Sequence, residues 1–240
     1  MTGSVIGFTS FSERSSKVLR SIPDSIFNLY KPVSRWESFY LRTRWRLCPF
    51  ELIESSLPSR GRILDFGCGY GMLSNLLAER SPERTVVGID LNPKRLGVAL
   101  RSVAERKNIH FHLGDVEGLH PSPFAAAVMT DVLHHIRDDQ VEILLRKVYR
   151  CLDQDGLLAI LDVDRTPFWK FCVTFTIDSL LNPTDRLWYR PLRRIQEMLK
   201  STGLKTEKVI PADHGLPLAD VLLLCRKNRD PDPRGDIGKT

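Results

Sequence analysis

The sequence predicts an α/β protein built around a mostly parallel β-sheet, and three observations support this fold class. Between Arg62 and Val163, short apolar or β-branched runs alternate with longer helical patterns, as they do when crossover helices join parallel strands. The run ILDFGCGYG (63–71) places a glycine-rich turn at the end of a buried strand. Two closing strand-like runs, LKTEKVIP and ADVLLLCRK, are joined by a short loop and predict an antiparallel hairpin at one edge of the sheet.

The predicted strands are short runs rich in β-branched and apolar residues. They are RILDF (62–66), RTVVGID (84–90), NIHFHLG (108–114), FAAAVMT (124–130) and GLLAILDV (156–163). The helices predicted between them are MLSNLLAERS, PKRLGVALRSVAERK, which has Pro93 in its first turn, and DDQVEILLRKVYRCL. A long insertion (163–190) and the helix RRIQEMLKSTG then lead into the closing hairpin.

The residues before the first strand, 1–60, fall outside this alternation and are expected to form a helical cap. Helical spacing within SRWESFYLRTRWRL predicts an apolar face beside a basic stripe. The apolar face consists of Trp36, Phe39, Tyr40, Thr43 and Leu47, and the stripe consists of Arg35, Arg42 and Arg46. The cap therefore precedes a sheet domain (61–228), and the polar, proline-bearing tail (229–240) is expected to be disordered.

Composition limits the cellular setting and the class of partner. The 240 residues are 42% hydrophobic and 27% charged, as in an ordinary globular domain. No run of about eighteen apolar residues occurs, and the N-terminus lacks the apolar core of a signal peptide, so a cytoplasmic location is expected. Five cysteines without CxxC spacing predict reduced thiols and no metal site. The net charge of +6 suits an anionic partner, but no RNA-binding motif is visible, so no specific nucleic-acid partner is expected.

Three predicted strands each end near a carboxylate. Asp65 lies two residues before the first glycine of the loop, Asp90 ends the second strand and Asp115 follows the third. Because ligands of open α/β sheets bind beyond the carboxyl ends of the strands, the three acids are expected to converge on one crevice. Each acid taken alone could instead be a helix N-cap, which is the common role of Asp after a strand.

The spacing of the glycines discriminates between nucleotide ligands. Gly67, Gly69 and Gly71 follow the pattern G-x-G-x-G, whereas the dinucleotide-binding fingerprint requires a glycine where Met72 stands. The carboxylate of Asp65 would also repel a pyrophosphate, while it suits a cation or an amine. An NAD(P)-dependent oxidoreductase is therefore the weaker alternative.

The loop DFGCGYG, the two downstream acids and the segment DVLHHI after the fourth strand together resemble the class I S-adenosylmethionine-dependent methyltransferases, especially the small-molecule types 11, 12 and 25. The resemblance covers Arg62 to Val163 and, more loosely, the closing hairpin. It implies a Rossmann-like, seven-stranded sheet with helices on both faces and the last strand antiparallel. It also implies S-adenosyl-L-methionine as the cofactor, with the loop around its methionine part, Asp90 on the ribose and Asp115 on the adenine. The expected cofactor-binding residues are Asp65, Gly67, Cys68, Gly69, Gly71, Asp90, Leu91, Asp115, Val116 and Thr130.

Methyl transfer from a sulfonium depends mainly on positioning, and it needs a base only when the acceptor carries a proton. The segment TDVLHHIRDD offers His134 and His135 as bases for a hydroxyl. Asp131 is expected to contact the cofactor's amino group or the acceptor. One of the two histidines is expected instead to pack against the cofactor or cap a helix. The segment lacks the Pro-Pro-aromatic motif of enzymes that methylate amino groups of nucleic-acid bases.

The insertion would roof the acceptor pocket and contains many large apolar side chains: Phe168, Trp169, Phe171, Phe175, Ile177, Leu180 and Leu181. Burial in the core would explain them equally well, but their place at the catalytic edge favours an apolar or lipid-like acceptor. The arginine stripe of the cap suits a phosphate, a carboxylate or an anionic membrane surface, although a solvated basic face is the simpler explanation. The sequence thus predicts methyl transfer to a small or lipid-like acceptor, on oxygen ahead of carbon or nitrogen. A catalytically silent, cofactor-binding subunit is the other alternative.

Overall fold

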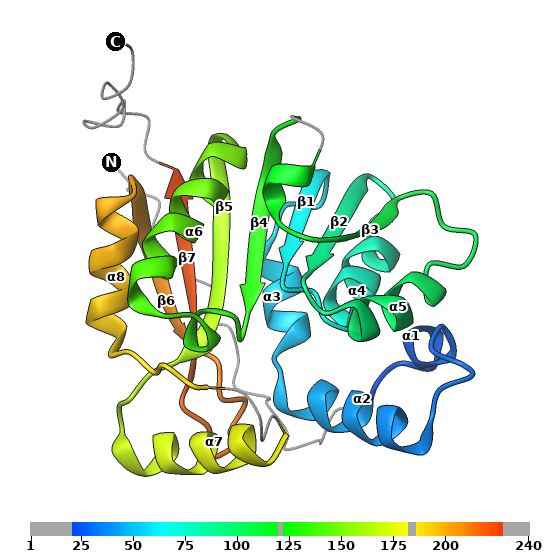
Figure 1. Cartoon of the computed structure of the whole chain (residues 1–240), viewed down its shortest axis with the longest axis horizontal. Coiled ribbons are helices and arrows are strands. Elements are labelled where there is room, and N and C mark those ends of the chain that lie inside the picture. Colours follow the sequence, from blue (N-terminus) through cyan, green and yellow to red (C-terminus); the bar gives the residue numbers. More distant parts are fainter. Residues whose placement is uncertain (1–20, 120–121, 182–185, 228–240) are drawn as a thin grey trace, which may run out of the picture.

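The computed structural model describes residues 21–119, 122–181 and 186–227, so the predicted tail (229–240) and the start of the cap lie outside the described residues. In the described part of the chain, the core is a seven-stranded sheet of order β3-β2-β1-β4-β5-β7-β6 (Figure 1). Its strands are β1 (Gly61–Phe66), β2 (Arg84–Asp90), β3 (Ile109–Leu113), β4 (Phe124–Thr130), β5 (Leu152–Val163), β6 (Leu204–Pro211) and β7 (Asp220–Lys227). The pairs from β3 to β5 are parallel, and β7 is antiparallel to both of its neighbours. The predicted fold class, including the antiparallel last strand, is confirmed.

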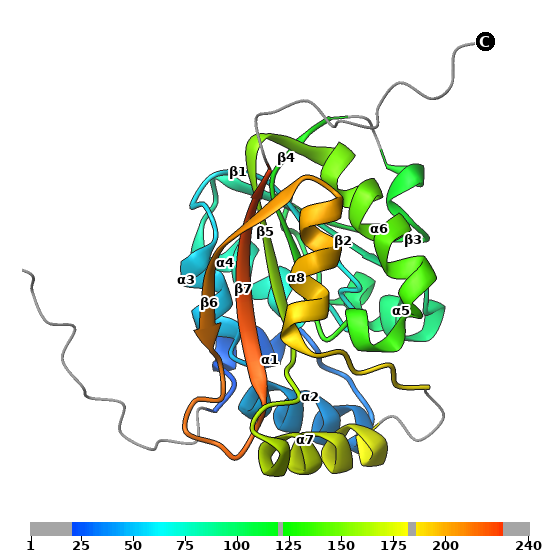
Figure 2. The ribbon, with the colours of Figure 1, turned by 90° about the vertical axis from the view of Figure 1, so that its left-hand side faces the viewer.

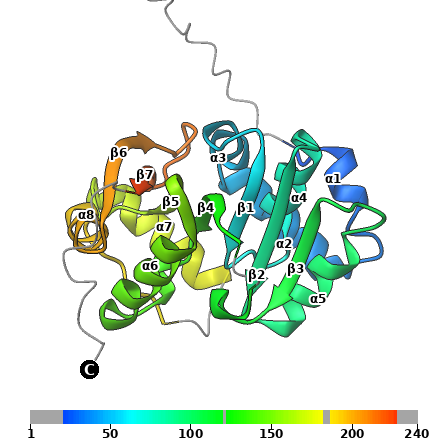
Figure 3. The same ribbon diagram turned by 90° about the horizontal axis from the view of Figure 1, so that it is seen from above.

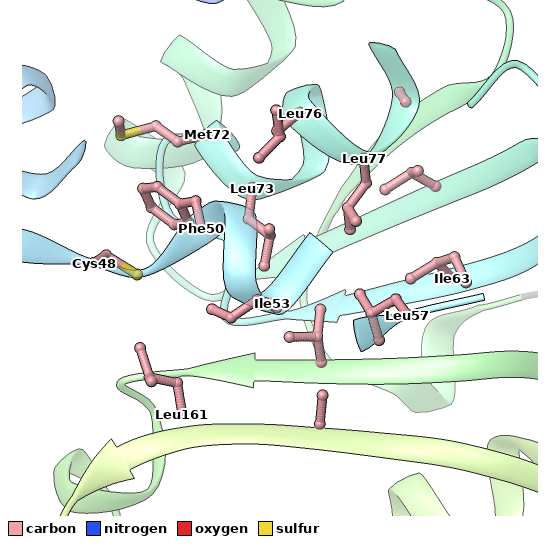
Figure 4. Packing of buried hydrophobic residues seen from close by; sticks show 14 of the residues in the cluster. Cys48, Phe50, Ile53, Leu57, Ile63, Met72, Leu73, Leu76, Leu77 and Leu161 are labelled. Carbon is pink, nitrogen blue, oxygen red and sulfur yellow. The ribbon is translucent and has the colours of Figure 1, made fainter. Parts of the chain in front are cut away.

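Helices cover both faces of the sheet, as Figure 3 shows from above. Because successive strand residues point to opposite faces, Ile63 packs in one apolar cluster and Leu64 in the other. The first cluster includes α3 (Phe50–Ser56), α4 (Met72–Arg80) and α5 (Pro93–Arg101), and Figure 4 shows Phe50, Leu73 and Leu161 within it. The second cluster includes α6 (Asp138–Cys151) and α8 (Leu192–Ser201).

Two element boundaries differ from the predicted ones by more than two residues. Strand β5 begins four residues before the predicted Gly156, because a bulge between its pairing with Phe124 and with Ala126 lets the strand continue. Helix α5 ends at Arg101 instead of running to Lys107. At that point the Ser102 hydroxyl donates to the carbonyl of Ala99 and accepts from Asn75 Nδ2, which fixes the end of the helix.

The described part of the cap consists of α1 (Asp24–Asn28), α2 (Arg35–Leu47) and α3. Helix α2 starts at a capping box, in which Ser34 and Glu37 satisfy each other's backbone N–H groups. The buried contacts of α2 come from Leu41 and Trp45, which lie outside the predicted apolar face. Two members of the predicted face, Trp36 and Phe39, are 62% and 54% exposed.

Half of the insertion forms α7 (Phe168–Leu181), which lies beside α2 across the carboxyl end of the sheet (Figures 1 and 2). Its inner side is held by Thr174, whose hydroxyl accepts from the backbone N–H of Ala219 at 3.0 Å. Burial in the core does not explain its apolar content, because four large side chains are exposed. These are Phe168 (68%), Trp169 (58%), Phe175 (46%) and Leu180 (74%).

All five cysteines are free thiols. None of the helices in the described ranges has both the length and the hydropathy that crossing a bilayer requires. The same part of the chain holds no cluster of three or more His, Cys, Asp or Glu side chains arranged around a metal ion.

Candidate active site

The loop between β1 and α4 uses its backbone N–H groups within the protein. The N–H groups of Gly67 and Cys68 both donate to the carbonyl of Ile89, at 2.8 and 3.0 Å. Gly69 N donates to Asp90 Oδ2 at 2.7 Å, and the N–H of the third glycine donates to Cys68 O at 2.8 Å. A pyrophosphate site needs such N–H groups free to face the ligand. The geometry therefore disfavours a dinucleotide at this loop.

The glycines of the loop serve different purposes. A Cβ at Gly67 would lie 2.7 Å from Val132 Cγ2, and one at Gly71 would lie 2.5 Å from the ring of Phe111, so both positions are needed for close packing. A Cβ at Gly69 would meet nothing within 4 Å. Of these glycines, only Gly69 would direct a Cβ into open space.

That space is a cavity at the carboxyl end of the sheet, with a volume of about 730 Å³ including its open mouth. Its walls come from the glycine loop, the end of β4, helix α2 and helix α7. This site cavity brings together several of the predicted residues: Asp65, Gly67, Cys68, Gly69, Thr130, Asp131, His134 and His135. The other predicted residues, Gly71, Asp90, Leu91, Asp115 and Val116, do not line it.

Asp65 is a buried carboxylate in the wall of the site cavity, only 2% exposed. Its Oδ2 accepts a hydrogen bond from the Ser74 hydroxyl at 2.5 Å. Burial raises the pKa of Asp65 to about 6, with the nearby charge of Asp90 acting in the same direction and the bond from Ser74 opposing it. The site thus holds an acid whose ionisation is sensitive to a neighbouring positive charge.

The other two strand-end acids take part in local backbone contacts. Asp90 accepts from the N–H groups of Gly69 and Asn92, both at 2.7 Å, which orients its carboxylate. Asp115 accepts from the N–H of Val116 and from Lys147 Nζ, at 2.7 and 2.6 Å. Asp115 therefore caps the short 3₁₀ helix η1 (Val116–Gly118), as the capping alternative predicted.

Arg44 is a site residue that the sequence did not single out. It reaches from α2 across the site cavity and pairs with the carboxylate of Asp131 at the end of β4. Burial alone would lower the pKa of Arg44, but the negative charge of Asp131 outweighs it and raises the pKa, so the guanidinium stays charged. The available signal was helical spacing, because Tyr40 and Arg44 share one face of α2 and both line the cavity.

His134 is the most buried titratable residue of the β4–α6 loop, with 1% exposure. Its Nδ1 lies 2.9 Å from Asp162 Oδ1 on β5, and the same carboxylate accepts from the backbone N–H groups of Leu133 and Val163. Burial lowers the pKa of His134, but the charge and hydrogen bond of Asp162 outweigh it and raise the pKa to about 9. The sequence placed Asp162 only within a strand. A carboxylate in an otherwise apolar run was the signal for its role.

The second ring nitrogen of His134 lies near a carboxylate of α7. His134 Nε2 is buried, lacks a hydrogen-bond partner among the described residues and lies 3.8 Å from Asp178 Oδ2 on α7. Asp178 accepts from the Tyr189 hydroxyl at 2.6 Å, and the Tyr189 ring stacks on His134 with centroids 5.1 Å apart. His135 lines the same cavity, with its ring centroid 4.4 Å from that of His134.

Beyond α7, the insertion forms hydrogen bonds with the β4–α6 loop, which carries His134. Trp188 N donates to the carbonyl of His134 at 2.6 Å. The buried guanidinium of Arg190 donates to the carbonyl of Leu133 at 2.8 Å and also to that of Ile136. Residues 188–190 therefore contact both the loop that carries His134 and, through Tyr189, Asp178 of α7.

Comparisons with known proteins find related methyltransferases. A family model described as a methyltransferase domain matches residues 63–156. The YqeM protein of Bacillus subtilis is 32% identical over 143 residues, which cover 58% of this chain and 51% of that protein. A demethylmenaquinone methyltransferase of Thermus thermophilus is 30% identical over 150 residues, which cover 62% of this chain and 67% of that protein. The chain thus spans about half the length of the first relative.

The fold is also found in solved structures. One is an O-methyltransferase from neocarzinostatin biosynthesis, in complex with S-adenosylmethionine and 2-hydroxy-5-methyl naphthoic acid. It superposes with a TM-score of 0.62, over 79% of this chain and 56% of that chain, at 15% sequence identity. At this identity the likeness shows the fold alone.

Proposed function

The chain belongs to the class I S-adenosylmethionine-dependent methyltransferases, and we propose that it transfers a methyl group from S-adenosylmethionine to a hydroxyl oxygen of a small or lipid-like acceptor. The observation that carries this proposal is His134. Its Nδ1 is fixed by Asp162, and its Nε2 is buried without a hydrogen-bond partner in the described structure. His134 lines the cavity that the glycine loop also lines.

The residues of the site cavity fit the cofactor of this family. Gly69 leaves open space in the wall, and the Thr130 hydroxyl is buried without a hydrogen-bond partner among the described residues. The buried carboxylate of Asp65 suits a ligand with a positively charged amine and sulfonium. We assign the ribose to Asp90 and the adenine to Asp115, because each carboxylate keeps unused lone pairs beyond the contacts described above.

S-adenosylmethionine, when bound, supplies a methyl group that is already activated for displacement from its sulfur. The chain must then position the acceptor oxygen and receive its proton. In neutral His134, Nδ1–H donates to Asp162, so Nε2 is the lone-pair nitrogen that takes the hydroxyl proton. The proton is lost from the oxygen as the new carbon–oxygen bond forms, and it remains on the imidazolium, which Asp162 stabilises.

The proposed acceptor class rests on the walls around His134. The aromatic rings of Tyr40 and Phe50 line the same cavity as the polar groups of His134 and Asp178. The similarity to a demethylmenaquinone methyltransferase supports a lipid-like acceptor.

The test is transfer of label from methyl-labelled S-adenosylmethionine into a lipid extract and a panel of phenols. We expect labelled product with the wild-type chain and loss of product with His134→Asn, while calorimetry shows unchanged cofactor affinity. His110→Asn, on the exposed side of β3, is the matched control and should keep full transfer. Cofactor binding without any labelled product would favour the silent subunit. Full transfer by His134→Asn would refute the assigned base.

A further inference from the structure

The outer face of α2 has an unusual composition. The exposed residues of this helix are Arg35, Trp36, Phe39, Arg42 and Arg46. Three of them are arginines and two are large aromatic residues, with no acidic residue among them. A surface helix normally presents charged and polar side chains to water and keeps its aromatic residues toward the core.

The outer face of α7 is apolar. The exposed side chains along its described length are Phe168, Trp169, Cys172, Phe175, Thr176 and Leu180, none of which is charged. Contiguous exposed apolar side chains of this size mark interaction sites on soluble proteins. The two outer faces together are called the α2/α7 face here.

The α2/α7 face lies next to the mouth of the site cavity. Both helices cross the carboxyl end of the sheet side by side (Figures 1 and 2). Tyr40 of α2 and Asp178 of α7 line the cavity. An exposed aromatic residue lies near each of them on the same helix: Phe39 directly before Tyr40, and Phe175 about one turn before Asp178. A partner that covers this face therefore lies against two helices that wall the site cavity.

We propose that the α2/α7 face docks on a bilayer that contains anionic lipids. Large aromatic and leucine side chains beside arginines are the composition of helices that lie in the membrane interface. The exposed Arg165 just before α7 adds to the positive charge of the α2 stripe, and each such arginine is attracted to an anionic leaflet. The aromatic residues enter the interface while the arginines contact phosphate groups.

Charge argues against a second copy of the chain as the occupant. A twofold interface places the same surface patch of both copies face to face. The arginine stripes of α2 would then oppose each other, and the described exposed residues of α2 and α7 include no acid to compensate them. A negatively charged lipid surface meets the same stripe with attraction.

Docking would open the site cavity toward the membrane. This consequence rests on the proposed function, because a lipid-like acceptor could then reach His134 without passing through water. The docking itself depends only on the exposed side chains of the face. Vesicle binding and methyl transfer are therefore separate measurements, and failure of one does not imply failure of the other.

The test is flotation of the full chain with vesicles of phosphatidylcholine, with and without phosphatidylglycerol. We expect binding only to vesicles with phosphatidylglycerol, and weaker binding at high salt. Trp169→Ser and Leu180→Ser should each weaken the partition about tenfold, and Arg35→Gln and Arg46→Gln about fivefold each. The controls are Leu100→Ser and Arg193→Gln, exposed on α5 and α8, which should bind like the wild type.

Cofactor calorimetry on every variant confirms that the fold is retained. Absence of vesicle binding by the wild type, or equal binding by the face variants and the controls, would overturn the proposal. It would also be overturned if light scattering showed a dimer that Trp169→Ser dissociates while vesicles do not bind. Binding that appears only after removal of residues 1–20 would assign the face to that segment instead.

Discussion

His134 and Asp162 form a buried pair in which Nδ1 of the imidazole lies 2.9 Å from Oδ1 of the carboxylate. The side chains are 1% and 2% exposed, so the attraction between them is weakly screened. Burial would raise the pKa of Asp162, but the positive charge of His134 holds it below its usual range. The pair therefore sets both the orientation and the proton affinity of the proposed base.

Asp162→Asn should shift the pH dependence of methyl transfer. Removing the carboxylate removes the main group that raises the pKa of His134, so the pKa falls from about 9 and the rising limb of kcat/KM moves to lower pH. The maximal rate should fall about a hundredfold, because the imidazole loses its orienting partner. A pH profile of kcat/KM measures this effect. An unshifted profile would contradict the role of Asp162, and Asp153→Asn, on the exposed part of β5, is the control.

The same pair should make stability depend on alkaline pH. The pKa of His134 is raised in the folded state from 6.5 to about 9, so its contribution to stability is fully present below pH 6.5. That contribution is lost as the pH rises through 9. Urea unfolding between pH 6 and pH 10 should show a decline in the free energy of unfolding that is smaller in His134→Asn. Parallel curves for the two proteins would disprove the linkage.

Asp65→Asn should stabilise the fold while weakening cofactor binding. The pKa of Asp65 is raised from 3.8 to about 6, so at neutral pH the folded state holds an ionised carboxylate that burial disfavours. Its neutral isostere still accepts the hydrogen bond of Ser74, and the gain is up to about 3 kcal/mol. Urea unfolding at pH 7 and calorimetry with S-adenosylmethionine measure the two effects. A less stable variant, or one with unchanged affinity, would contradict the account.

Arg44 and Asp131 should show coupled effects on stability. Arg44→Met leaves the carboxylate of Asp131 without its cation, at a cost of about 1–3 kcal/mol, since both side chains are partly exposed. Asp131→Asn removes the negative charge that Arg44 neutralises, and asparagine can adopt the left-handed backbone at this position, where φ is 54°. The double variant should therefore be more stable than Arg44→Met alone. A double-mutant cycle by urea unfolding tests this, and strict additivity would argue against the pair.

Gly67→Ala and Gly69→Ala should separate packing from ligand binding. The methyl of Gly67→Ala would collide with Val132, so it should lower the free energy of unfolding, and Val132→Ala should restore part of the loss. Gly69→Ala meets no atom and adds only the strain of a left-handed backbone, about 1–2 kcal/mol. Its methyl projects into open space at the site, so cofactor affinity should fall. Equal affinity in the wild type and Gly69→Ala would place the cofactor elsewhere.

Local pattern was enough to predict most of the fold. The alternation of apolar runs and helical spacing has a short period, so it can be read from neighbouring residues. Strands β2 and β4 have the predicted bounds, and the closing hairpin forms as expected. The boundaries that differ by more than two residues are those of β5 and α5. They depend on a bulge opposite Phe124 and on a hydrogen bond from Asn75, which are contacts with distant parts of the chain.

The sequence by itself therefore determined the sheet, the glycine loop and the family of the domain, because these follow from local periodicity and motif spacing. Only the tertiary structure decided the partners in the site. Arg44 meets Asp131 across 87 positions of the chain, and His134 meets Asp162 across 28. It also decided that Trp36 and Trp169 face outward, because exposure depends on which neighbouring helix covers a side chain. Such contacts form only when chain folding brings distant segments together, and no local pattern specifies them.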